Sequence, residues 1–171
     1  MLPSYDMPDP LPHHYSASLR RTRTPRPHVE DPRGTELHGG RSLVFDKDVR
    51  VQSPEHMLLT SLGLCMLATL EQIAERDGIE ILTCDAKIGG TVEETSEGPM
   101  FTSIVLELDM ALAGNIDLVE NTLEDAKQYC VVQNSLRAPV VIETLLRTPD
   151  ELPPELQPLA PHGTLDRHHA S

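Results

Sequence analysis

Three cysteines are the residues of this chain that could carry nucleophilic or redox chemistry. Cys65 lies within an apolar segment of helical character, Cys130 lies near the end of a second such segment, and Cys84 lies in a segment of strand character. A thiolate is a nucleophile, and two thiols can form a disulfide when their Cα atoms come within about 7 Å. Buried cysteines are also common as small apolar packing groups, so the pattern alone leaves both roles open.

Other kinds of site lack the residues that they need. The sequence has no C-x-x-C, H-x-x-x-H or H-E-x-x-H motif, so we expect neither a metal centre nor a cofactor. Gly39-Gly40 and Gly89-Gly90 lack the flanking residues of a phosphate-binding loop. His56 stands in the first turn of the predicted central helix, where a local hydrogen bond is the simpler role.

Charge and composition exclude several classes of protein. The formal net charge of −13 repels the phosphates of nucleic acids, so we expect no nucleic-acid partner. No apolar run reaches the roughly 18 residues of a membrane span, and the N-terminus lacks the basic and apolar regions of a signal peptide. We therefore expect no membrane partner, and free thiols in the reducing cytoplasm.

The chain divides into one domain and two tails. Residues 1–12 contain four prolines, and residues 149–171 are again polar and rich in proline, so both ends are predicted to be flexible. Residues 13–148 form the predicted domain. Its first part has the character of two strands, Tyr15–Arg23 and Ser42–Val51, joined by a link rich in proline and glycine.

A central helix is predicted to follow these strands. Ser53 is typical of a helix cap, Pro54 suits the first helical position, and Asp77-Gly78 marks the end. The helix is apolar on nearly all sides as far as Leu67, which indicates burial on nearly all sides. Because one sheet cannot cover such a helix, we expect a second copy of the chain to cover the remaining apolar stripe in an obligate homodimer.

The second half of the domain continues the alternation of strands and helices. Ile79–Glu94 and Met100–Ala111 are predicted as a hairpin, followed by a helix over Asp117–Gln133 and a strand over Pro139–Leu146. The inward face of that helix is expected to carry Val119, Leu123, Ala126 and Cys130. The order ββαββαβ predicts an α+β fold with two main helices on one face of an antiparallel sheet.

Two segments in register resemble the OsmC/Ohr family, named for osmotically inducible and organic hydroperoxide resistance proteins. The segment SPEHMLLTSLGLCMLATLEQIA is similar to the family's first-cysteine helix, with Pro54, Glu55 and Cys65 at the family's spacing. The segment EDAKQYCVVQNSLRAPVVIE resembles its second-cysteine helix and the strand that follows. The separation of 65 positions between Cys65 and Cys130 is also similar to that of the family. The resemblance covers the chain from about residue 53 to residue 146.

The resemblance implies an OsmC-like fold, an intertwined homodimer, and sites at the subunit interface. It implies that Cys65 attacks a peroxide oxygen to become a sulfenic acid, which Cys130 resolves to a disulfide. A dithiol such as a lipoyl group would then reduce the disulfide. Glu55 would position an arginine that activates Cys65. The implied function is that of a thiol-dependent peroxidase that reduces organic hydroperoxides.

The activating arginine is the point at which this sequence departs from the family. A T-G-G-R-like turn after the first strand is missing, and Arg23 and Arg41 are the two candidates. This departure motivates a second hypothesis from a different class. The chain would then be a non-enzymatic OsmC-like dimer that binds a hydrophobic ligand or partner, with Cys65 and Cys130 as packing residues.

Overall fold

Residues 15–16, 18–20, 28–30, 36–38 and 52–153 are described by the structure, which is a computed structural model. Three short strands, β1 (Ser18–Arg20), β2 (His28–Glu30) and β3 (Glu36–His38), form an antiparallel sheet of their own. β1 lies inside the first predicted strand, whereas β2 and β3 lie in the segment that was predicted as a link. The second predicted strand, over 42–51, lies outside the described residues.

The central helix α1 (Pro54–Asp77) has the predicted bounds, and its ends follow from the local sequence. The hydroxyl of Ser53 accepts the backbone N–H of His56 at 3.3 Å, which caps the first turn. At the other end Gly78 has a φ of 72°, and its N–H bonds to carbonyl groups of the last turn. Glycine takes this left-handed conformation at little cost, so the helix stops there.

The main sheet is built from β4 (Ile79–Thr95), β5 (Gly98–Gly114) and β6 (Val140–Arg147), in the order β4-β5-β6. β4 and β5 form the predicted hairpin, with a turn of two residues, Ser96 and Glu97. β6 runs parallel to β5, however, so the sheet is mixed and the prediction of an antiparallel sheet is wrong. The reason lies in the helical connection between β5 and β6, which returns the chain to the start of β5 before β6 begins.

That connection is not the single helix predicted over 117–133. A short 3-10 turn, η1 (Ile116–Leu118), leads into α2 (Val119–Tyr129), and a second, four-residue helix α3 (Val131–Asn134) follows. Cys130 separates α2 from α3 with an extended backbone, at φ −70° and ψ 99°. The β-branched pair Val131 and Val132 follows directly, and such residues continue a helix less readily than unbranched ones.

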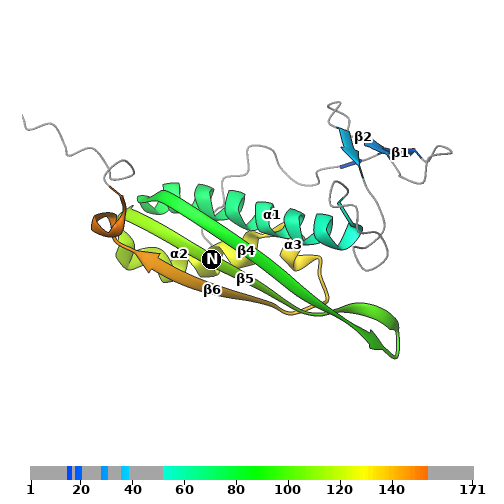
Figure 1. Ribbon diagram of the computed structural model, residues 1–171. Helices are drawn as coiled ribbons and strands as arrows, with labels where there is room; N and C mark the ends of the chain where they lie inside the picture. The colour runs from blue at the N-terminus through cyan, green and yellow to red at the C-terminus, as the bar shows by residue number, and fades with distance from the viewer. Residues whose placement is uncertain (1–14, 17, 21–27, 31–35, 39–51, 154–171) are drawn as a thin grey trace, which may run out of the picture.

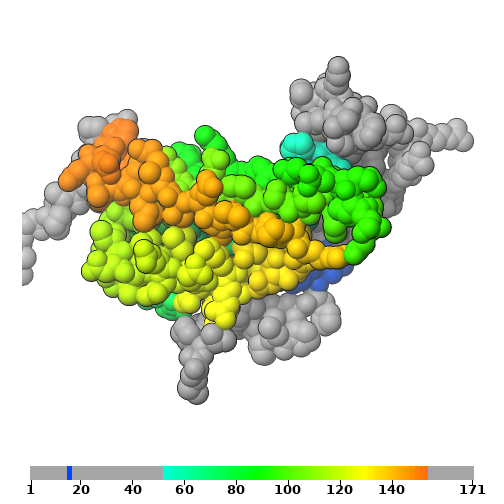
Figure 2. Space-filling model, turned by 90° about the horizontal axis from the view of Figure 1, so that it is seen from below, coloured from blue at the N-terminus to red at the C-terminus, as the bar shows by residue number. Residues whose placement is uncertain are grey.

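α1 and the α2–α3 segment cover the same face of the mixed sheet (Figure 1). In Figure 2 the α2–α3 segment (yellow-green to yellow) lies alongside β6 (orange). Alternate residues of β5 face the helices and are buried, as the period of two in a strand requires. The core between the layers includes Leu62, Met66, Leu70, Ile73, Ile104, Leu106, Leu108, Met110, Leu123, Ala126 and Cys130.

Two features adjoin this core. Beyond β6, the 3-10 turn η2 (Pro149–Glu151) is followed by Leu152, which is buried, so packed structure continues past residue 148.

Among the described helices, α1 is also long and apolar enough, by length and composition, to cross a membrane. A core helix passes the same test, and α1 contributes Leu62, Met66, Leu70 and Ile73 to the core.

A polar cluster fixes the end of α1 against the start of α2. Arg76 pairs with Asp77 and, across to α2, with Asp125, each at 2.7 Å. Thr122, whose exposed fraction is 1%, donates its hydroxyl to Asp77 at 2.6 Å. Arg76 holds the pKa of Asp77 below its usual value, and Thr122 adds to this effect against the opposing effect of burial.

The substitution Thr122→Val is expected to lower the free energy of unfolding by about 1–3 kcal/mol, because it removes a buried hydrogen bond to a carboxylate at nearly constant volume. Urea denaturation followed by circular dichroism measures this loss. Thr144→Val, at an exposed position of β6, is the matched control and should change stability by less than about 0.5 kcal/mol. Equal losses for the two variants would contradict the structural role given to Thr122.

Candidate redox site

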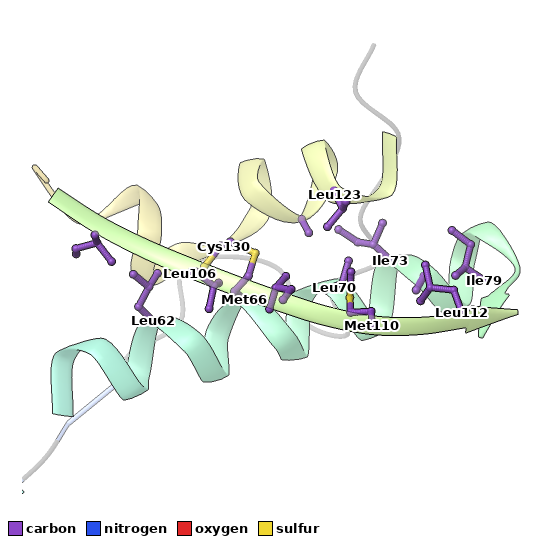
Figure 3. Packing of buried hydrophobic residues seen from close by; sticks show 14 residues of the cluster. Leu62, Met66, Leu70, Ile73, Ile79, Leu106, Met110, Leu112, Leu123 and Cys130 are labelled. Atoms are coloured by element: carbon purple, nitrogen blue, oxygen red, sulfur yellow. The ribbon is translucent and has the colours of Figure 1, made fainter. Parts of the chain in front are cut away.

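Cys65 and Cys130 meet between α1 and the α2–α3 segment. The two thiols lie close enough for Cys65 to affect the pKa of Cys130, although the residues are 65 positions apart in the chain. Cys130 is fully buried, and Cys65 is partly buried against the same core. Figure 3 shows Cys130 pointing into the layer between α1 and β5, close to Leu62, Met66 and Leu106. The structure therefore brings together the two cysteines that the sequence singled out, with both thiols free.

The contact follows from how the helices pack. α2 begins beside the end of α1, where Thr122 bonds to Asp77, and it runs back along α1 until Cys130 stands opposite Cys65. From Thr122 to Cys130 the chain advances by eight positions, whereas the residue opposite on α1 moves back by twelve positions, from Asp77 to Cys65. The α2–α3 segment is therefore antiparallel to α1. Residues that follow Cys130 therefore lie beside the first half of α1, as Figure 1 also shows for α3.

Burial controls the ionisation of Cys130. Desolvation disfavours the thiolate and, with the nearby thiol of Cys65, raises the pKa of Cys130 to about 11. The backbone N–H groups of Gln133 and Val132 lie near the sulfur and act in the opposite direction, although neither makes a well-formed capping hydrogen bond. Cys130 is thus a protonated thiol at neutral pH.

Cys65 is the less buried of the two cysteines, so it is the one that an incoming group can reach, which suits it to act as the nucleophile.

Cys84 takes no part in this contact. It lies on β4 against the core, and burial followed by the charges of Asp85, Glu71 and Asp109 raises the pKa of its thiol. A partly buried thiol surrounded by carboxylates is held in its protonated form. Cys84 therefore has the character of a packing residue.

Two buried oxygen atoms of the described side chains have no hydrogen-bond donor. One is Oε2 of Glu55, in the first turn of α1, and the other is Oε1 of Gln133, on α3. Buried polar atoms in proteins nearly always have partners, and the exceptions often mark functional positions. Glu55 was predicted as a site residue from its place in the helix motif. Gln133 was not predicted as a site residue. The only signal in the sequence is its position three residues after Cys130, which is not part of a motif.

No arginine between residues 52 and 153 is available to Glu55 or Cys65. Each of the three arginines in this part of the chain already pairs with a carboxylate at 2.6–2.7 Å. The pairs are Arg76 with Asp125, Arg137 with Glu97, and Arg147 with Asp109. The predicted candidates, Arg23 and Arg41, both lie outside the described residues.

The hollows of the described surface lie away from the thiol pair. One of about 500 Å³ opens on the face of the sheet opposite the helices, lined by Asp85, Lys87, Glu107, Asp109 and Glu143 among others, but by neither Cys65 nor Cys130. Within the described residues, no three His, Cys, Asp or Glu side chains are grouped to hold a metal ion. The chemistry available at this site is therefore that of the two thiols.

A long helix and a two-helix segment on one face of a mixed sheet define an α+β class with several solved members. An OsmC-like protein of unknown function from Vibrio cholerae superposes with a TM-score of 0.70 at 18% identity, over 78% of this chain and 99% of that one. An organic hydroperoxide resistance protein from Elizabethkingia anophelis gives 0.63 at 15% identity, over 81% and 98%. The organic hydroperoxide resistance protein OhrB of Bacillus subtilis gives 0.59 at 14%, over 79% and 98%.

The sequence itself identifies the family. A profile of the OsmC-like proteins matches residues 48–145, and the chain belongs to that family. The matched region contains α1, the whole hairpin and the α2–α3 segment, and with them both cysteines of the contact. No curated protein matches the chain. The fold and the family are thus established, while the solved relatives include proteins of unknown function as well as hydroperoxide resistance proteins.

Cys130 is expected to react with iodoacetamide far more slowly at pH 8 than a free cysteine, whose pKa is about 8.5. A thiol with a pKa of about 11 is ionised in roughly one molecule per thousand at that pH, so the rate should fall by more than about a hundredfold. Site-resolved mass spectrometry after timed alkylation of the reduced protein, at pH values from 7 to 11, measures this. The rate should still rise above pH 9.5, and a plateau reached by pH 9 would contradict the burial argument.

Proposed function

We propose that this protein is a thiol-dependent peroxidase that reduces organic hydroperoxides. Cys65 attacks the terminal oxygen of the peroxide, the O–O bond breaks, and Cys65 becomes a sulfenic acid while an alcohol is released. Cys130 then attacks the sulfur of Cys65, which forms a disulfide and releases water. A dithiol reductant, such as a lipoyl group on a protein, returns both residues to thiols.

The proximity of the two thiols inside the fold is the observation that carries this proposal. Resolution of a sulfenic acid requires a second thiol within bonding reach, and Cys130 is already in contact with Cys65. A pair of core cysteines with a packing role alone needs no such contact. The raised pKa of Cys130 also fits the role, because a protonated thiol does not compete with Cys65 for the peroxide.

The surroundings of the pair favour a substrate with an apolar part. No charged residue stands between His56 and Leu70 on α1, and Leu64, next to Cys65, is 64% exposed. Val131, next to Cys130, is also exposed. An alkyl or lipid hydroperoxide can bury its carbon chain against such a surface, whereas hydrogen peroxide gains nothing from it.

Glu55 is proposed to hold the cation that activates Cys65. Its buried Oε2 lacks a donor, and a guanidinium is a donor that suits a carboxylate well. All three arginines of residues 52–153 are engaged elsewhere, so we expect the activating arginine to come from outside this part of the chain. Arg23 and Arg41 remain the candidates, from the same chain or from a second copy.

A second copy of the chain is part of the proposal. Only 39% of the apolar window of α1 is buried within one chain, although that window has the composition of a membrane span. An apolar face of this size is unfavourable in water, and a twofold contact between two α1 helices would cover it. The site would then lie between the two chains, where the exposed Leu64 belongs to the interface.

Addition of cumene hydroperoxide to the reduced protein is expected to consume two of the three thiols of each chain, because Cys65 and Cys130 form a disulfide. Titration of free thiols and peptide mapping of the disulfide measure the outcome. Cys84→Ser is the matched control and should consume peroxide as fast as the unmodified protein. Cys65→Ser should lose at least about 99% of the rate, since no other thiol is placed as the nucleophile.

Two results would contradict the peroxidase. One is a Cys65→Ser variant that reduces the peroxide at the original rate. The other is a protein whose three thiols all remain titratable after prolonged exposure to several organic hydroperoxides. The second result would favour a non-enzymatic dimer that binds a hydrophobic ligand, in which the two cysteines serve only to pack the core.

Sedimentation velocity is expected to give the mass of two chains, and Leu64→Glu is expected to shift the protein towards the monomer, because a buried carboxylate without a partner costs several kcal/mol. Ile116→Glu, at another exposed apolar residue, in η1, is the matched control and should leave the mass unchanged. A monomeric unmodified protein at micromolar concentration would contradict the dimer.

A further inference from the structure

Gln133 stands next to the thiol pair. Cys130 is the residue before α3, Gln133 is its third residue, and the backbone N–H of Gln133 lies near the sulfur of Cys130. In a helix the residue before the first turn and the third residue of that turn share a face, which is why their side chains commonly meet. The thiol of Cys65 lies near the sulfur of Cys130, so it lies near the start of α3 as well.

The amide oxygen of Gln133 is a buried acceptor with no donor in the reduced protein. Leaving such an atom without a partner is unfavourable, so a donor that arises at this place would be stabilised. Within the described residues, Oε2 of Glu55 is the only other buried side-chain oxygen without a hydrogen-bond donor. It lies in the first turn of α1, ten residues before Cys65. Gln133, three residues after Cys130, is therefore the one of these two acceptors that the chain places near the thiol pair.

The chemistry of the pair itself creates a donor at this place. When the Cys65 thiolate takes the terminal oxygen of a hydroperoxide, the S–O bond forms and the O–O bond breaks, sulfur loses two electrons, and the alkoxide leaves and takes a proton from solvent. The terminal oxygen keeps its hydrogen, so the product carries an S–O–H group. This hydroxyl is formed inside the protein, where no incoming group has to reach the buried oxygen.

We propose that Oε1 of Gln133 accepts the hydroxyl hydrogen of the Cys65 sulfenic acid. This inference rests on the proposed function and adds a positioning residue to it. An acceptor for this hydrogen favours the neutral sulfenic acid over its anion. The neutral acid is the better electrophile for Cys130, whose attack forms the S–S bond, breaks the S–O bond and releases water with the proton of Cys130. The anion is the form that a second peroxide oxidises further, so Gln133 also protects Cys65 from over-oxidation.

The test uses full-length protein with Cys130→Ser, in which the sulfenic acid cannot be resolved. Over-oxidation of Cys65 to the sulfinic acid is followed by mass spectrometry across pH 5 to 9, and its midpoint reports the ionisation of the sulfenic acid. Gln133→Leu is expected to lower that midpoint by about 0.5–1 pH unit, because one hydrogen bond to the neutral sulfenic acid is lost. At pH values below the midpoint, over-oxidation should then be about three- to tenfold faster. Gln133→Glu keeps an acceptor and should keep the midpoint at or above its original value.

Two further measurements separate this role from a structural one. Because Oε1 has no donor in the reduced protein, Gln133→Leu should leave the alkylation rate of reduced Cys65 within about twofold, and should not lower the urea midpoint. Gln128→Leu, the same change at an exposed position at the end of α2, is the matched control and should leave the over-oxidation midpoint unchanged.

The outcomes are distinguishable from failure of the peroxidase itself. If dimedone traps no sulfenic acid at Cys65 when Gln133 is present, the proposed function is wrong. If dimedone traps the acid but Gln133→Leu leaves the midpoint unchanged, or Gln133→Glu lowers it equally, the proposed function stands and the role of Gln133 is wrong. A loss of stability in the reduced Gln133→Leu protein would also overturn this role.

Discussion

The antiparallel packing of α1 against the α2–α3 segment is the constraint on which the site depends. It is fixed at one end by the ion pairs of Arg76 and the buried hydroxyl of Thr122, and along its length by the apolar core. Given that alignment, the spacing of residues along the two segments leaves Cys130 opposite Cys65. The redox pair is thus a result of helix alignment, and a shift of one turn, about 5.4 Å, would separate the two thiols.

Burial keeps Cys130 protonated. The same apolar layer that packs the helices desolvates this thiol and raises its pKa. A nucleophile in such a layer needs a cation, and the three arginines of residues 52–153 are all in ion pairs with other carboxylates. The need for a cation and the exposed part of α1 are therefore the two observations behind the proposal that a second chain completes the site.

Much of this architecture could be predicted from the sequence, for identifiable reasons. Ser53, Pro54 and Gly78 mark the ends of α1 through local chemistry, and alternation marks the hairpin, so both elements were predicted. The direction of β6 relative to β5 was not predicted, because the residue pattern of a strand is the same in a parallel and in an antiparallel pair. The break at Cys130 was missed because apolar periodicity continues through it. Cys65, Cys130 and Glu55 come from motifs, whereas the unpaired oxygen of Gln133 depends on tertiary packing that no local pattern encodes.

The extended backbone of Cys130 has a mechanical consequence. One backbone hydrogen bond ties Cys130 to Ala126 at the end of α2, and another ties Asn134 to Cys130 at the start of α3. Rotation about the backbone of this single residue reorients the four residues of α3 and leaves the eleven residues of α2 clamped to α1. The sulfur of Cys130 therefore lies at the joint between α2 and α3, and in the proposed reaction the displacement that turns the thiol contact into a covalent bond would act on this joint.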